Sequence, residues 1–106
     1  MAHELPQAAD LSVFTAVVED GGFAEAARRL GADPSTLCRA VSRLVGQLGV
    51  TLLRRSTRAI EVTPEGLAVL RSARDILDRT EALRDIAAAG RAPRGPLRVN
   101  APVSYV

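Results

Sequence analysis

The segment DPSTLCRAVSRLVGQL, residues 33–48, sets the architecture of this chain. Asp33 suits the N-cap of a helix, and Pro34 suits the first helical position, where its missing N–H is not needed. Apolar side chains then recur at steps of four, three and four residues, which places them on one face of a helix. They are Leu37, Val41, Leu44 and Leu48.

The opposite face of this predicted helix carries hydroxyl groups and guanidinium groups with almost no acid. Its members are Ser35, Thr36, Arg39, Ser42 and Arg43. Hydroxyl and arginine side chains are suited to bind phosphates and guanine edges. The segment therefore predicts a DNA recognition helix. The alternative is an ordinary amphipathic helix with a solvated basic face.

Two shorter helical patterns precede this segment. Apolar periodicity predicts a helix over residues 7–20 and another over 23–30, with Gly21-Gly22 as the break between them. Gly31 closes the second helix and leads through a tight turn into the third. Two helices, a brief glycine turn and a hydroxyl- and arginine-bearing helix are typical of a helix-turn-helix. A generic small helical bundle is the alternative.

A basic hairpin is predicted directly after the recognition helix, which we expect to end at Gly49. Residues 52–53 and 60–62 have strand character, and residues 54–58 between them read RRSTR. Such a basic tip can reach backbone phosphates or the minor groove, so the hairpin is predicted to be a wing. A solvated surface turn is the alternative.

A long helix follows from residue 63 to about Ala89, started by Thr63-Pro64-Glu65 and stopped by Gly90. Some 26 residues would span roughly 40 Å, more than a domain of this size needs. An apolar stripe along it predicts pairing with a second copy, a homodimer, unless the helix folds back on its own domain. The stripe is Leu70, Ala73, Leu77, Thr80, Leu83 and Ala87, reinforced by Leu67, Ile76 and Ile86.

The net charge is only +2, but the positive charge is concentrated. Residues 28–58 contain seven arginines against one acid, Asp33, whereas residues 1–27 contain five acids and no arginine. This distribution favours a polyanionic partner. Cys38 is the sole cysteine and His3 the sole histidine, so the sequence predicts no disulfide, no metal site and no cofactor. No acid–base pair or phosphate loop indicates an enzyme.

Three segments are expected: a mainly α winged helix-turn-helix over 1–62, a linker and dimerisation helix over 63–90, and a hinge with the start of a truncated second domain over 91–106. Residues 90–96, GRAPRGP, are typical of a hinge and lead into LRVN, which alternates like a strand that has no partner. We therefore expect a chain cut shortly after a second domain begins. No apolar run is long enough for a membrane span, and no signal pattern is present, which predicts a cytoplasmic protein.

The whole chain resembles the N-terminal part of LysR-type transcriptional regulators. The matching stretches are FTAVVEDGGFAEAARRLG, the LCRAVSRL…LGVTLL…R core, the STR…VTPEG wing and GPLRVNAPVS, and the resemblance as a whole extends over about residues 5–104. The resemblance implies a winged helix-turn-helix, a linker helix that pairs antiparallel between protomers, and a C-terminal ligand-sensing domain.

Carried over by position, the resemblance implies DNA contacts from the recognition helix and the wing. The helix residues are Ser35, Thr36, Cys38 and Arg39, and the wing residues are Arg55, Thr57 and Arg58. The family commonly has Ser where Gly22 and Cys38 stand, Glu at Val45, Phe at Leu53 and often Gln at Pro34. These departures bear on fine specificity rather than on the fold, since a thiol is a weaker donor than a hydroxyl.

The leading hypothesis is sequence-specific binding of double-stranded DNA at an inverted repeat, by a homodimer or higher oligomer, with RNA polymerase as a further candidate partner. The predicted DNA-binding set is Pro34, Ser35, Thr36, Cys38, Arg39, Ser42, Arg43, Arg55, Thr57 and Arg58. A helical interaction module and a winged-helix regulator of another family are the alternatives. A redox switch at Cys38 is a lesser hypothesis, against the plain reading of a small serine substitute.

Overall fold

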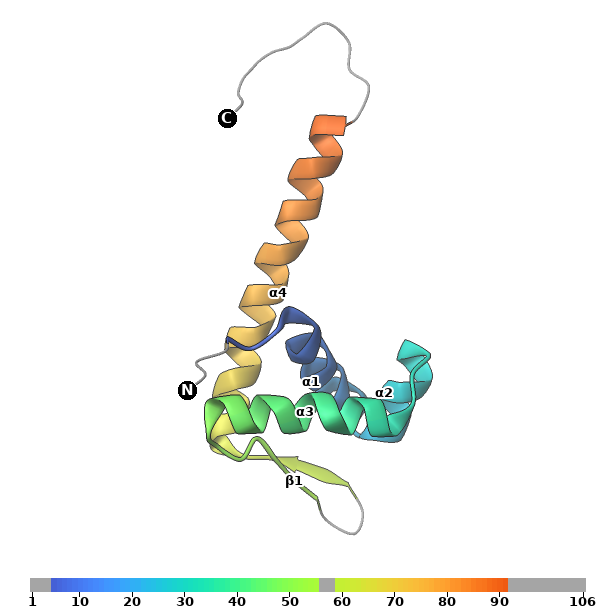
Figure 1. Ribbon diagram of the computed structural model, residues 1–106, viewed down its shortest axis with the longest axis vertical. Helices are drawn as coiled ribbons and strands as arrows, with labels where there is room; N and C mark the ends of the chain where they lie inside the picture. The colour runs from blue at the N-terminus through green and yellow to red at the C-terminus, as the bar shows by residue number, and fades with distance from the viewer. Residues whose placement is uncertain (1–4, 56–58, 92–106) are drawn as a thin grey trace, which may run out of the picture.

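A computed structural model of the protein describes residues 5–55 and 59–91. Within these residues, four helices and a two-stranded antiparallel sheet follow one another (Figure 1). They are α1 (Ala8–Asp20), α2 (Phe23–Leu30), α3 (Pro34–Leu48), β1 (Leu53–Arg55), β2 (Ile60–Val62) and α4 (Pro64–Arg91). The fold class predicted from the sequence, mainly helical with a wing and a long final helix, is confirmed.

Helix α1 lies at the centre of the domain, because it packs against α2, α3 and α4. Phe14 of α1 is fully buried, as are Leu44 of α3 and Leu52, which precedes the wing. These three side chains belong to one cluster that also includes Leu70 and Ala73 of α4. A second cluster joins α1 to α2 and to Leu37 of α3. The apolar faces of three helices are thus fixed by α1.

The turn between α2 and α3 is as short as the sequence indicates. Gly31 adopts a left-handed conformation with φ of 67°, which a glycine reaches without steric cost. The Ala32 N–H then donates to the Ala27 carbonyl at 2.9 Å. Asp33 has the extended backbone of an N-cap, but its carboxylate accepts from the Ser35 hydroxyl at 2.8 Å rather than capping an N–H.

The wing is a short antiparallel hairpin with the register Leu53↔Val62, Arg54↔Glu61 and Arg55↔Ile60. Strand β1 begins at Leu53, one residue later than predicted. Leu52 directly precedes the strand: its side chain is buried in the core, and its carbonyl accepts from the Thr63 N–H at 3.1 Å. Residues 56–58 at the tip, including the predicted DNA contacts Thr57 and Arg58, lie outside the described residues.

Thr63 joins the wing, the core and α4. Its buried hydroxyl donates to the Thr51 carbonyl at 2.6 Å and accepts from the Gly66 N–H at 2.8 Å. A Cβ at Gly66 would overlap the Leu52 carbonyl oxygen and lie 2.8 Å from Val62 Cγ1, so only glycine fits this close approach. The angle at which α4 leaves the domain is therefore fixed at its first turn.

Helix α4 packs on α1 near its start and then extends well beyond the domain (Figure 1). The predicted stop at Gly90 is wrong, because the helix continues to Arg91. A glycine inside a helix costs about 1 kcal/mol relative to alanine but does not by itself end it. The boundary at residue 63 is otherwise well placed, since Thr63 precedes the first helical residue, Pro64.

Candidate nucleic-acid interface

The two faces of α3 are separated as the apolar spacing predicts. Leu37, Val41 and Leu44 are buried, together with Ala40, whereas Leu48 at the end of the helix is partly exposed. The predicted contact residues on the other face are exposed: Pro34, Ser35, Thr36, Arg39, Ser42 and Arg43. Anchored on one side by the core, α3 presents hydroxyl and guanidinium groups on the other.

Arg39 lies near the centre of this exposed face. Its Nη2 donates to the Thr36 hydroxyl oxygen at 3.3 Å, one helical turn earlier. It takes part in none of the ion pairs formed between described residues. Its charge is therefore uncompensated and its remaining N–H donors are directed to solvent, as a base-edge or phosphate contact requires.

Arg43 differs from Arg39 because it is held by an acid. Its Nε and Nη2 each donate to one carboxylate oxygen of Asp10, both at 3.0 Å. The hydrogen bond and the charge of Asp10 raise the pKa of Arg43 above its ordinary value. The sequence predicts Arg43 as a DNA contact, but in the structure one edge of its guanidinium binds α1. This pair was missed because its partners stand 33 residues apart.

The other arginines of the basic segment divide into two groups. Arg28 is paired with Glu25, and Arg29 with Asp20 at 2.7 Å, so α2 contributes little uncompensated charge. Arg54 and Arg55 of β1 take part in none of the ion pairs between described residues. Among the described arginines, Arg39 of α3 and Arg54 and Arg55 of the wing therefore carry uncompensated charge, as do Arg71 and Arg91 of α4.

Arg55 connects the wing to the recognition helix. Its Nη2 donates to the sulfur of Cys38 on α3 at 3.1 Å. Its guanidinium also lies over the ring of Phe23, 5.1 Å from the centroid, a cation–π contact at the start of α2. The Cys38 side chain is half-buried and is a thiol that forms no disulfide. Arg55 and Cys38, both predicted at the interface, are thus in contact, and Phe23 is a supporting residue that sequence reasoning missed.

The apolar stripe of α4 is divided between two environments. Leu70 and Ala73 are buried in the protomer's own core. The prediction that these two residues contact a second copy is therefore wrong. Leu77 and Thr80 are partly exposed, and the Thr80 hydroxyl donates to the Ile76 carbonyl at 3.0 Å. Farther along, Leu83 is 65% exposed and Ala87 is also exposed. Of the six stripe residues, only the four beyond Ala73 are therefore left for a partner.

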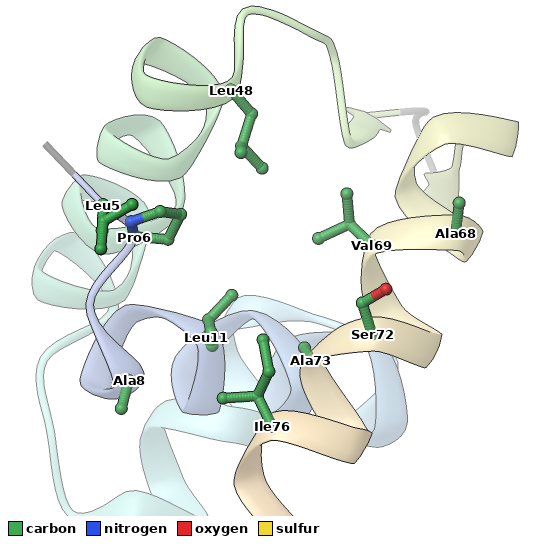
Figure 2. A pocket seen from close by; sticks show the side chains of 10 residues that line it. All are labelled: Leu5, Pro6, Ala8, Leu11, Leu48, Ala68, Val69, Ser72, Ala73 and Ile76. Atoms are coloured by element: carbon green, nitrogen blue, oxygen red, sulfur yellow. The ribbon is translucent and has the colours of Figure 1, made fainter. Parts of the chain in front are cut away.

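An apolar groove begins where α4 leaves the domain. It has a volume of about 500 Å³ and is lined from the N-terminal segment, α1, α3 and α4. Figure 2 shows the side chains of Leu48, Val69 and Ile76 directed toward this common space. The groove joins the exposed apolar side chains of α4, so one continuous uncovered surface runs from the domain onto the projecting helix.

Two further observations concern the described residues as a whole. None of their helices is long and apolar enough to cross a membrane. Their His, Cys, Asp and Glu side chains form no group of three or more that could hold a metal ion.

Comparisons with known proteins agree with this geometry. The chain is 42% identical over 95 residues to a probable hydrogen peroxide-inducible genes activator of Mycobacterium xenopi, covering 89% of this chain and 50% of that protein. It is 40% identical over 98 residues to the HTH-type transcriptional regulator CrgA of Neisseria meningitidis serogroup C, covering 92% and 33%. The chain thus spans between a third and a half of these relatives.

A solved structure of a CbnR DNA-binding domain in complex with DNA is similar in fold, with a TM-score of 0.75 and 38% identity. The match covers 81% of this chain and 99% of that chain. Residues 8–67 match the family described as bacterial regulatory helix-turn-helix proteins of the lysR type. The chain therefore belongs to the LysR family of transcriptional regulators, and this segment is its helix-turn-helix DNA-binding domain.

Proposed function

We propose that this chain binds an inverted-repeat DNA site as a homodimer, with α3 of each protomer in a major groove. The observation that carries the proposal is the position of the uncompensated cations. Arg39 on α3 and Arg55 on the adjoining wing have no acidic partner among the described residues, whereas the arginines of α2 do. Free guanidinium groups on one exposed helix face and the next hairpin fit a duplex.

Each side chain has a distinct task in this proposal. Arg39 reads a base edge, best suited to the two acceptors of guanine. Ser35 and Thr36, in the first turn of α3, hold backbone phosphates and fix the register of the helix in the groove. Arg55 holds the wing against α3 through Cys38 and Phe23, so that the hairpin meets the backbone beside the groove.

The homodimer is proposed to form on the uncovered surface of α4 and the apolar groove. Ile76 and Leu83 stand seven residues apart, which places them on the same side of the helix, and both are exposed. Exposed leucine and isoleucine on a projecting helix are costly in water unless another surface covers them. A second copy supplies an identical surface and, by its two-fold symmetry, presents two recognition helices to an inverted repeat.

The experiment that tests DNA recognition starts with a selection of bound duplexes from a random pool. On the selected site, Arg39→Ala is expected to lose about 1–3 kcal/mol of binding free energy and to relax the preference at one base pair. Arg71→Ala, which removes an equally unpaired guanidinium from the side of α4 turned away from Ile76, is the matched control and is expected to retain both. An Arg39→Ala variant with unchanged affinity and preference would contradict the role of Arg39.

The relatives' greater length supports a following effector domain with its own ligand. A contact with RNA polymerase is proposed because one relative is named as a genes activator. The proposed binding to DNA supports a place of action in the bacterial cytoplasm. The proposal includes no enzymatic step, since the proteins to which the chain is similar are named as regulators and an activator.

A further inference from the structure

Asp10 is an unusual residue in this domain because it is a buried acid on a helix that presents no side chain to the proposed duplex. Its side chain is only 5% exposed, and among the described acids it is the one that is buried. Both of its oxygens accept from Arg43, which is the bidentate geometry that carboxylates and guanidinium groups favour. The pair crosses from α1 to the recognition helix.

Arg43 stands one turn after Arg39 on α3, so the two guanidinium groups are neighbours along the helix. The Arg43 side chain is 56% exposed, and Asp10 occupies only its Nε and Nη2 edge. Without its acid, Arg43 would be a further mobile cation beside the DNA-reading face. With it, the guanidinium is fixed toward α1 and its charge is compensated.

We infer that Asp10 is a specificity-determining residue, which withholds Arg43 from non-selective binding of the phosphate backbone. The inference rests on the proposed function, since it concerns how that DNA interface discriminates. A cation on the backbone binds every sequence alike, whereas base contacts distinguish one sequence from another. By compensating the charge of Arg43 on α3, Asp10 therefore weakens binding to random DNA and leaves the base contact of Arg39 in place.

Arg43 cannot exchange Asp10 for a phosphate without cost. If Arg43 moved away from Asp10, the buried carboxylate would remain as an unpaired charge without water around it, which is strongly unfavourable. An exposed acid such as Glu19, which binds Arg74 at 3.2 Å, imposes no comparable constraint because water can solvate it. Burial of Asp10 is thus what keeps Arg43 in place when a duplex is near.

The test compares the salt dependence of binding to a random-sequence duplex for the wild-type chain and for Asp10→Asn. Asparagine keeps the shape and one accepting oxygen but removes the charge. The plot of log affinity against log salt concentration is expected to steepen by about 0.9, the contribution of one phosphate contact. Between about 50 mM and about 200 mM salt, this is roughly a further 3.5-fold loss of affinity. The affinity ratio of selected to random DNA is expected to fall.

Two controls separate this effect from a change in net charge. Glu19→Gln removes the same charge from the same helix and frees Arg74 on α4, and its salt dependence is expected to match the wild type. In the Asp10→Asn/Arg43→Gln variant the added slope is expected to disappear. An unchanged slope in Asp10→Asn, or an equal rise in Glu19→Gln, overturns the inference.

If Asp10→Asn does not fold, the salt dependence is instead compared between two double variants that both carry Asp10→Ala and therefore both lack the buried charge. Asp10→Ala/Arg43→Lys is expected to give a slope steeper by about 0.9 than Asp10→Ala/Arg43→Gln. Equal slopes in that pair also overturn the inference. A wild-type chain with no affinity for any duplex would instead contradict the proposed function itself, so the two failures are distinguishable.

Discussion

At the scale of single residues, Thr63 has the most connected polar side chain of the described chain. Its hydroxyl bridges the Thr51 and Leu52 carbonyls and the Gly66 N–H, all at the point where the hairpin meets α4. A buried hydroxyl that both donates and accepts contributes more than its own hydrogen bonds, because its removal leaves the partners unsatisfied. Geometry at this joint orients the wing beneath the recognition helix.

We predict that Thr63→Val destabilises the domain by about 1–3 kcal/mol, because valine keeps the shape but leaves the buried Gly66 N–H without its partner. Denaturant unfolding at one fixed protein concentration measures the change, since dimerisation makes stability depend on concentration. Thr63→Ser restores the hydroxyl and is expected to recover most of the loss. Equal stability of the valine and wild-type chains would argue against this joint.

Residue roles that depend on local spacing could be predicted from the sequence, and those that depend on distant partners could not. The exposed positions of Ser35 and Arg39 follow from the 3.6-residue period of α3. The pairing of Arg43 with Asp10 requires knowing that the first turn of α1 lies beside the middle of α3. Likewise, nothing local indicates that Arg55 stacks on Phe23, because the two stand on different elements.

At the scale of elements, α4 behaves as two segments of different character. Its first turns complete the core through Leu70 and Ala73, whereas its later turns expose Leu83 and Ile86. One apolar stripe in the sequence is therefore divided between the core of the domain and an exposed surface. Periodicity identified the stripe but could not divide it, since the division depends on where the packed domain ends.

We predict that Ile76→Glu prevents dimerisation, because it places a charge within the surface proposed to be covered by the second copy. Analytical ultracentrifugation is expected to record a monomer at concentrations where the wild type is a dimer. Leu67→Glu is the matched control, because Leu67 is also an exposed apolar residue of α4, 45% against 44%. It stands nine residues earlier and therefore on the opposite side of the helix, so its predicted place in the same stripe as Ile76 is wrong. A dimeric Ile76→Glu chain would rule out this interface.

At the scale of the whole molecule, the domain and its arm form an elongated particle with principal extents of 60 × 34 × 22 Å. The 28 residues of α4 span roughly 42 Å at the ordinary helical rise. A straight helix anchored by the close contact at Gly66 is a stiff connection. Two such protomers would hold their recognition helices at a set distance and angle, rather than at a range of separations.

We therefore predict that binding depends steeply on the spacing of the two half-sites. Inserting five base pairs between them turns one half-site by about half a helical turn and is expected to reduce affinity about tenfold or more. Electrophoretic mobility shifts on the selected site and its insertion derivatives measure this dependence. The same insertion placed outside the repeat is the control. Equal affinity for both derivatives would indicate that each protomer binds alone.

Helix α1 bears a consequence for how this domain tolerates change. It makes no proposed contact with DNA, yet it supports α2, α3 and α4, and six of its thirteen residues are buried. A substitution there disturbs several interfaces at once, while one on the duplex-facing side of α3 alters a single contact. In a saturation mutagenesis screen for DNA binding, the strictest positions would therefore fall on a helix that is proposed to touch no part of the duplex.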